Sequence, residues 1–186
     1  MAQPHAAPSR PAGEAPSQRW SVAVAEVLLK HRVHVVAYVP DEVTGHLLNR
    51  LQAQPACTVV CCTREEEAVA TVAGAYLGGK RGAVVLQTSG IGNSMNVLGS
   101  FVVPYQIPML LIVSERGGLG EFNPAQVPLG HALPRVLDAL GIQTFALTSE
   151  ADIAPVLSGA ADLAFATMAP VAVVLTMRLT GGKTLR

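Results

Sequence analysis

The sequence predicts an α/β fold: an open, doubly wound, mostly parallel six-stranded sheet with helices on both faces. Strand-like and helix-like segments alternate along most of the chain. The strand-like segments are continuous apolar runs, which indicates strands that are covered on both faces. Half of the 186 residues are hydrophobic and 14% are charged, so the chain can bury a core and is not disordered over its whole length.

The expected elements follow one another in a regular order. Strands are expected at the apolar segments 33–39, 58–62, 83–88, 109–114, 143–147 and 171–176. Helices are expected at 18–32, 41–51, 63–77, 89–103 and 133–140, and from about residue 150. A Gly/Pro-rich loop is expected at 115–130. In such folds the functional crevice lies at the carboxyl ends of the strands.

Three regions follow from composition. Residues 1–19 are Pro/Ala-rich and are predicted to be a disordered tail, residues 20–180 one domain, and residues 181–186 a flexible C-terminus. The longest apolar stretch, 160–177, is interrupted by Asp162 and Pro170, so no membrane span is expected.

Charge and cysteine content exclude further classes of protein. The formal net charge is zero and aromatic residues are 4%, which argues against nucleic-acid binding. The three cysteines, Cys57, Cys61 and Cys62, are too few and too close for a disulfide framework, and no histidine lies at metal-finger spacing from them. We therefore expect no metal site within this chain and a reducing, cytoplasmic location.

Three successive glutamates, Glu65, Glu66 and Glu67, open the expected helix 63–77. Acidic residues at a helix N-terminus compensate the helix dipole, which is the simplest explanation for them. The rest of this helix is rich in Ala, Val and Gly, so we expect at least one of the glutamates to point inward. A buried carboxyl can retain its proton if burial outweighs the helix dipole.

The segment Ser89-Gly90-Ile91-Gly92-Asn93 follows an apolar strand and opens a helix. Such a segment lets bare backbone approach a ligand, although a simple tight turn explains it equally well. It is neither a Walker loop nor a complete dinucleotide fingerprint.

Two further segments carry candidate residues. The 115–130 loop is longer than most connections, and Arg116, Gln126 and His131 in and beside it offer donors for an anionic substrate. Asp41 follows the strand 33–39, where it is expected to cap the next helix and also lies at the rim of the crevice.

These segments together resemble the pyrimidine-binding (PYR) domain of thiamine-diphosphate enzymes. The resembling residues are TREEEAVATVAGAYLGGK, LQTSGIGNSMNVLGSF, YQIPMLLIVSERG and PAQVPLG, in that order. Within this family the chain is most similar to the alpha subunit of sulfopyruvate decarboxylase and to the N-terminal part of phosphonopyruvate decarboxylase. The resemblance covers about residues 33–141.

The resemblance implies roles for particular residues. The family's activating glutamate lies ten residues before a tyrosine, here Tyr76, which makes it Glu66. That glutamate hydrogen-bonds ring nitrogen N1′ of the cofactor's pyrimidine. Thr88 and the Ser89–Asn93 segment would lie beside the pyrimidine. A second catalytic role is implied for Asp41.

The resemblance also implies what this chain lacks. The family binds the diphosphate and Mg²⁺ through a Gly-Asp-Gly motif in a second, PP domain, and this sequence has no Gly-Asp-Gly. We therefore expect a separate PP-domain subunit, a hetero-oligomer, and a small anionic 2-oxo acid as substrate. A mean hydropathy of +0.39 agrees with a large buried interface.

Two alternatives stay open from the sequence. One keeps the cofactor but joins two carbon skeletons, as in acetolactate synthesis, and the other is a non-catalytic, flavodoxin-like binding module. Glu115 stands where the sulfopyruvate enzymes tend to carry histidine, so a 2-oxo acid other than sulfopyruvate is also possible.

Overall fold

The computed structural model describes residues 18–183, and these form one sheet flanked by helices. Every strand pairing is parallel, and the strand order is β2-β1-β3-β4-β6-β5. The strands are β1 (Val33–Tyr38), β2 (Thr58–Cys61), β3 (Arg81–Gln87), β4 (Met109–Ser114), β5 (Gln143–Leu147) and β6 (Pro170–Leu175). The predicted α/β class and six-stranded sheet are confirmed.

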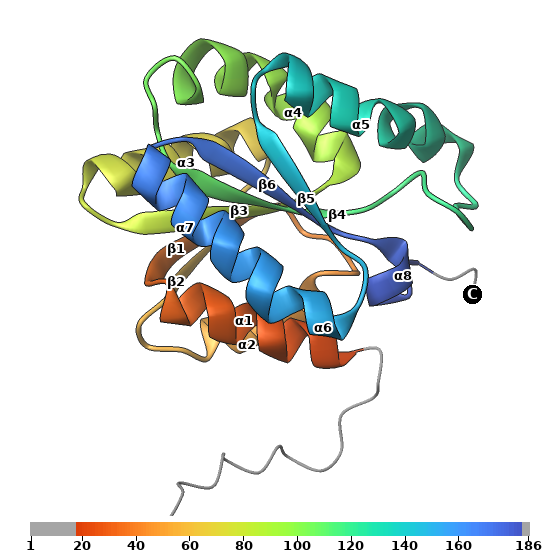
Figure 1. The fold of residues 1–186 in the computed structure, drawn as a ribbon, viewed down its shortest axis with the longest axis horizontal. Helices are drawn as coiled ribbons and strands as arrows, with labels where there is room; N and C mark the ends of the chain where they lie inside the picture. Colours follow the sequence, from red (N-terminus) through yellow and green to blue (C-terminus); the bar gives the residue numbers. More distant parts are fainter. Residues whose placement is uncertain (1–17, 184–186) are drawn as a thin grey trace, which may run out of the picture.

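Helices cover both faces of this sheet (Figure 1). On one face lie α3 (Glu65–Leu77), α4 (Thr88–Val97) with its π-helical continuation η2 (Leu98–Val102), and α5 (Val127–Ala139). On the other face lie α1 (Arg19–Lys30), α2 (Gly45–Gln52), and α6 (Glu150–Asp152), which continues through η4 (Ile153–Leu157) into α7 (Ser158–Thr167). The short helices η3 (Pro124–Gln126) and α8 (Met177–Thr180) lie at the carboxyl edge of the sheet.

Each central strand contributes to two separate apolar cores. In β4, Leu110 and Ile112 join the core beneath α1 and α7, whereas Leu111 and Val113 join the core beneath α3, α4 and α5. Successive side chains of a strand point to opposite faces, so a strand with helices on both sides has to be apolar at every position. This explains the continuous apolar runs in the sequence.

The helix α5 begins six residues earlier than the expected helix 133–140. The side chain of Asn123 accepts a hydrogen bond from the backbone amide of Ala125, and Pro128 lies in the first turn of α5, where a missing amide hydrogen costs nothing. Pro134 lies inside the helix, and the Gly and Pro residues of 115–130 are what made its first turn look like loop.

Two other sequence expectations concern the ends of the chain. The predicted tail 1–19 lies outside the described residues except for Gln18 and Arg19, at the start of α1. Of the predicted flexible C-terminus, residues 181–183 are described. Among residues 18–183, no helix has both the length and the apolar character that crossing a bilayer requires.

Candidate functional site

The strand order places a crevice between β1 and β3. The chain leaves β1 through α2 on one face of the sheet and leaves β3 through α4 on the other. Connections that diverge in this way open a space at the carboxyl ends of the two strands, where ligands bind in open α/β sheets. Asp41 lies in the loop after β1, and α4 begins at Thr88, directly after β3.

Of the three glutamates, Glu65 is the one that points inward. Glu65 is 9% exposed, and its Oε2 accepts a hydrogen bond of 2.8 Å from Nδ2 of Asn93. A Cβ atom on Gly90 would lie 2.6 Å from Cγ of Glu65, so the two helices approach closely only because residue 90 is glycine. Glu65 therefore joins the N-terminal ends of α3 and α4.

Glu66 lies beside this contact with its side chain 36% exposed. Its own backbone amide and the guanidinium of Arg64, whose Nε lies 2.7 Å from Oε1, hold the pKa of Glu66 below its ordinary value. The sequence predicts that at least one of the three glutamates points inward, and in the chain by itself that residue is Glu65. The proton-retaining role that the resemblance implies for Glu66 concerns the assembled enzyme and stays a prediction.

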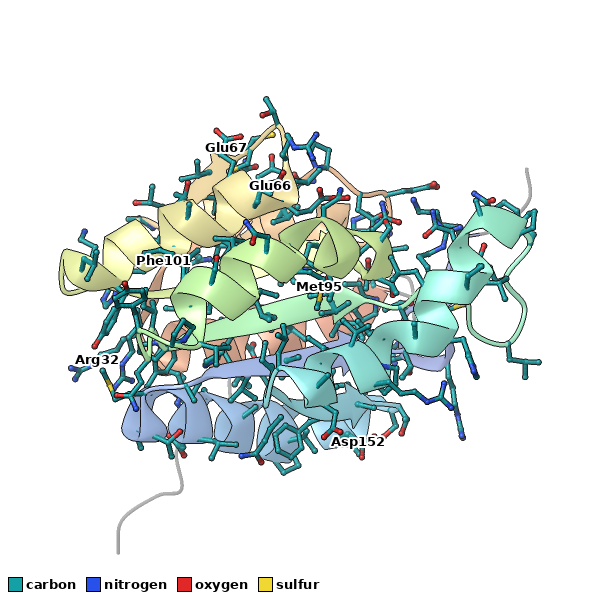
Figure 2. All side chains as sticks on the ribbon, turned by 90° about the horizontal axis from the view of Figure 1, so that it is seen from above. Arg32, Glu66, Glu67, Met95, Phe101 and Asp152 are labelled. Atoms are coloured by element: carbon teal, nitrogen blue, oxygen red, sulfur yellow. The ribbon has the colours of Figure 1, made fainter. Side chains whose placement is uncertain are left out.

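One oxygen of Glu66 is nevertheless set apart. Its Oε2 is buried and has no hydrogen-bond partner among the described residues. Figure 2 shows Glu66 and Glu67 at the N-terminal end of α3. An ionised oxygen without a partner is unfavourable, and it is the atom of this carboxylate that is available to a ligand.

Glu67 has a local structural role. Its Oε2 accepts hydrogen bonds of 2.8 Å from both the backbone amide and the hydroxyl of Thr63. These bonds lower the pKa of Glu67. The carboxylate thereby fixes the turn from β2 into α3.

The Ser89–Asn93 segment is the first turn of α4 itself. Ile91 is fully buried, Ser89 is half-buried and Asn93 is exposed at the surface. A Cβ atom on Gly92 would lie 2.9 Å from Cδ2 of Leu129 at the start of α5. The two glycines therefore admit side chains of the neighbouring helices, Glu65 and Leu129, and the role of this segment beside a ligand stays a prediction.

Thr88 connects β3 to the end of β4. Its hydroxyl donates to the backbone carbonyl of Ser114 over 3.3 Å and accepts from the backbone amide of Arg116 over 3.0 Å. Thr88 and Ser114 are both completely buried. This network sets the position at which α4 begins relative to the loop after β4.

Asp41 belongs to the same network. Its side chain is 2% exposed, its Oδ2 accepts a hydrogen bond of 2.7 Å from Ser114 Oγ, and its Oδ1 lies 2.7 Å from Nζ of Lys183. The expected capping role is wrong, because α2 begins at Gly45, after Thr44, without a side-chain cap. Asp41 is instead a buried carboxylate at the crevice, paired with the C-terminal segment.

Arg116 is fully occupied by an acid of its own loop. Its Nε and one terminal nitrogen, Nη2, each lie 2.7 Å from an oxygen of Glu121, and the two side chains are 4% and 2% exposed. The guanidinium lowers the pKa of Glu121 to about 2. The prediction that Arg116 offers a free cation to an anionic substrate is therefore not supported by this arrangement.

Gln126 and His131 lie at the start of α5. The Oε1 atom of Gln126 is buried and has no hydrogen-bond partner among residues 18–183. His131 is exposed, and its Nε2 lies 3.1 Å from Nη1 of Arg135, one turn further along the same helix. Gln126 thus offers an unpaired acceptor, whereas His131 points to the surface of α5.

A hollow of about 710 Å³ adjoins this edge between the loop after β4 and α8. It is lined by Glu115, Leu119, Gly120, Phe122, Met177, Arg178, Gly181 and Lys183. Its two cations are Arg178, which is exposed, and Lys183, which is paired with Asp41. In the part of the chain that the structure describes, no group of His, Cys, Asp and Glu residues has metal-binding geometry.

Sequence reasoning missed Glu65, Ser114, Glu121 and Lys183. A helical period would have found Glu65, because positions 65, 68, 69 and 72 share one face and all are buried. The other three contribute through pairings that only the tertiary structure creates.

Comparison with known proteins agrees with this architecture. The sequence model of the family "Thiamine pyrophosphate enzyme, N-terminal TPP binding domain" matches residues 19–118. The chain is 36% identical over 155 residues to the sulfopyruvate decarboxylase subunit alpha of Methanococcus maripaludis, which covers 83% of this chain and 93% of the relative. It is 40% identical over 127 residues to the same subunit of Methanocaldococcus jannaschii, which covers 68% of this chain and 75% of the relative.

Two further similarities are more partial. A phosphonopyruvate decarboxylase of Streptomyces viridochromogenes is 42% identical over 104 residues, which is 56% of this chain and 25% of that protein. Among solved structures, a 2-oxoglutarate:ferredoxin oxidoreductase from Magnetococcus marinus superposes with a TM-score of 0.66 at 17% identity, covering 87% of this chain and 29% of that one. At that identity the structural match shows a shared fold alone.

Proposed function

Because this chain belongs to the thiamine pyrophosphate enzymes, as their N-terminal TPP binding domain, we propose that it is the pyrimidine-binding subunit of a thiamine-diphosphate-dependent 2-oxo acid decarboxylase. The family expected from the sequence is confirmed. The names of the relatives favour the sulfopyruvate or phosphonopyruvate type, and they argue against the non-catalytic alternative.

The unpartnered, buried Oε2 of Glu66 at the start of α3 is the main support for this proposal. When bound, thiamine diphosphate supplies a carbon nucleophile that adds to the 2-oxo group and then holds the electron pair released with CO₂. Glu66 would hold a proton at Oε2 for a ring nitrogen of the pyrimidine. The residues present therefore fit the cofactor's ring end.

Glu66 can hold that proton only if its pKa rises. In the chain alone its pKa is lowered by its own backbone amide and by Arg64. A partner subunit and a bound ring that cover Glu66 would remove water from it, and burial raises the pKa of a carboxyl group. We therefore propose that assembly makes Glu66 competent as a proton donor.

Glu65 is proposed to be a positioning residue. Its bond to Asn93 and its packing against Gly90 set the spacing between the starts of α3 and α4. Glu66 follows it directly and is carried on the same first helical turn. An error of about 1 Å in the position of such a group costs on the order of a hundredfold in rate.

The proposal includes a second subunit that binds the diphosphate and Mg²⁺. Two of the relatives are named as alpha subunits, and this sequence contains no Gly-Asp-Gly motif. Pyrimidine and diphosphate would then be held by different chains. The active site would lie between them, as part of a hetero-oligomer.

For the substrate's anionic tail we propose Arg178 in place of Arg116. Arg178 lines the hollow beside the loop after β4, and it has no ion pair among the described residues. A guanidinium suits a sulfonate or phosphonate group because it donates in a planar fork. Gln126 and His131 remain proposed substrate contacts at the same edge, and Asp41 remains a proposed catalytic residue there.

Three glutamine substitutions of neighbouring glutamates test the proposal. CO₂ release from sulfopyruvate and phosphonopyruvate is measured on the enzyme assembled with its partner and thiamine diphosphate. We expect Glu66→Gln to lower kcat by roughly 10²–10⁴-fold, the range typical of a lost proton donor. Glu67→Gln is the matched control, with kcat near wild type and a small loss of stability from the weakened hydrogen bonds to Thr63.

A substitution of Glu65 shows whether this residue is a positioning residue or the proton donor. As a positioning residue, Glu65→Gln keeps an oxygen that accepts from Asn93, so kcat should fall far less than in Glu66→Gln. Full activity of Glu66→Gln together with an inactive Glu65→Gln would transfer the proton-donor role to Glu65 and contradict the assignment made here.

A further inference from the structure

Basic side chains gather at the amino edge of the sheet, away from the crevice. A hollow of about 330 Å³ there is lined by Lys30, His31, Arg32, His34, Gly79 and Arg81. The chain as a whole has no net charge, with 13 basic and 13 acidic residues. The positive charge is therefore a local concentration and not a property of the whole surface.

The fold brings two separate basic segments together. Helix α1 ends at Lys30, and β1 begins at Val33. In the parallel pairing of β1 with β3, Val33 lies opposite Arg81. The segments 30–34 and 79–81 therefore meet at the amino ends of these strands, and Figure 2 shows Arg32 at the other end of α3 from Glu66.

Within residues 18–183, Lys30, Arg32 and Arg81 form no ion pair with an acidic side chain. Arg81 is held in place by a hydrogen bond of 3.1 Å from Nη1 to the carbonyl of His31 and by stacking over Phe165, with Cζ 4.7 Å from the ring centroid. Neither the hydrogen bond nor the stacking contact neutralises the charge of Arg81. Among the described residues, the acid that pairs here is Asp162, 3.4 Å from His31 Nδ1 and 76% exposed.

Two ring nitrogens in the walls of the hollow are also unsatisfied. His31 Nε2 and His34 Nδ1 are both buried and have no hydrogen-bond partner within residues 18–183. A buried polar atom without a partner is unfavourable, because it has lost its hydrogen bonds to water. When His31 is protonated, Nδ1 donates to Asp162 and Nε2 offers a second N–H, which only an acceptor can satisfy.

We propose that this hollow is a binding site for a small multivalent oxyanion, a phosphate or diphosphate group. Such a group accepts from guanidinium, ammonium and imidazole N–H donors together, and side chains of all three kinds line this hollow. A volume of about 330 Å³ accommodates a diphosphate or a small phosphate ester. The site is independent of the proposed function, because it lies at the opposite edge of the sheet.

A simpler explanation makes a different prediction. Basic residues at the end of α1 could serve only to compensate the negative end of the helix dipole. In that case, removing a charge changes stability slightly and leaves no specific anion binding to lose. The unpartnered nitrogens of His31 and His34 argue for a ligand.

The test follows the histidine ring signals of the full chain by NMR during titration. The probes are inorganic phosphate, pyrophosphate and glycerol phosphate, each against sodium chloride at constant ionic strength. We expect saturable shifts for His31 and His34, with the ring of His46 unchanged as the internal control. Tighter binding of the ester than of inorganic phosphate would identify an organic phosphate as the natural ligand, and the reverse would identify the free anion.

Arg32→Gly removes a charge without endangering the fold. Arg32 has φ of 58°, a left-handed conformation that glycine adopts freely, so this variant should be at least as stable as wild type. Binding should weaken at least about tenfold, as for the loss of one charge-assisted hydrogen bond. Arg19→Gln, at the other end of α1, is the control and should bind as wild type.

Two results would overturn the proposal. One is the absence of saturable shifts at His31 and His34 with all three probes. The other is equal weakening of binding by Arg19→Gln and Arg32→Gly, which would show a diffuse ionic-strength effect.

Discussion

Glu65 and Glu66 are adjacent in the sequence and lie in opposite environments. Successive residues of a helix point about 100° apart, so only one of them can face the neighbouring helix. Glu65 shares its face with the buried Val69 and Val72. The spacing to Tyr76 favoured Glu66 for the cofactor, and the structure adds that Glu65 is the residue holding this region together.

Gly90→Ala adds one methyl group and tests the contact between Glu65 and Gly90. The new Cβ would lie 2.6 Å from Cγ of Glu65 and force α3 and α4 apart. We expect a loss of about 1–3 kcal/mol in the free energy of unfolding, measured by denaturant titration.

Gly74→Ala is the matched control within α3. No atom lies within 4 Å of its added Cβ, so alanine should stabilise the helix by about 0.5–1 kcal/mol. Equal effects of the two substitutions would show that Gly90 is not in a tight contact.

The Arg116–Glu121 pair predicts a pH dependence. The pKa of Glu121 is lowered from 4.5 to about 2, chiefly by Arg116, so the folded protein binds this proton more weakly than the unfolded chain. The stabilisation is therefore complete above about pH 4.5 and is lost as pH falls toward 2. Thermal unfolding between pH 3 and pH 7 measures this loss.

Glu121→Gln removes the titrating group while keeping its shape. At pH 7 we expect it to lower the free energy of unfolding by roughly 3 kcal/mol, because the buried guanidinium loses its counter-charge. The difference between variant and wild type should shrink at pH 3. A difference that stays constant with pH would mean that the carboxylate charge contributes nothing.

At the scale of elements, the segment after β4 differs most from expectation. The sequence predicts a loop at 115–130, whereas the structure places η3 and the first turn of α5 within it. Gly117 and Gly130 pack so closely that a Cβ on Gly130 would meet the backbone carbonyl of Arg116. This close approach of Gly117 and Gly130, together with the buried Arg116–Glu121 pair, gives the segment 115–130 a defined shape.

Gly130→Ala should therefore disrupt this segment as a unit. A backbone atom cannot move aside as a side chain can, so the loop has to open. We expect faster amide hydrogen exchange across 116–130 with little change in the strands. Leu119→Ala, at a fully exposed side chain of the same loop, should leave exchange unchanged.

At the scale of the whole molecule, this chain offers one side of the proposed site. The strand order brings the loop of Asp41 and the start of α4 to one edge, and Glu66 stands there with an unpartnered oxygen. Large apolar side chains such as Leu77 and Tyr105 are 73% and 70% exposed at the other end of these helices. Both features agree with a chain that acts within an assembly.

Titration with the cofactor tests whether the site is divided between two subunits. Calorimetry should find no saturable binding of thiamine diphosphate and Mg²⁺ to the chain alone, and saturable binding once the partner subunit is present. The physical reason is that the chain lacks the Gly-Asp-Gly motif for the diphosphate. Tight binding by the isolated chain would contradict the two-subunit site.

The sequence by itself determined the α/β class, the approximate position of all six strands and the family. These features depend on local apolar runs and on motifs that lie within short stretches of chain. Only the tertiary structure decided which glutamate is buried, that Asp41 pairs with Ser114 and Lys183, and that Arg116 is occupied by Glu121. Burial and charge pairing depend on which segments meet in space, and residues 73 positions apart, such as Asp41 and Ser114, carry no local signal of their contact.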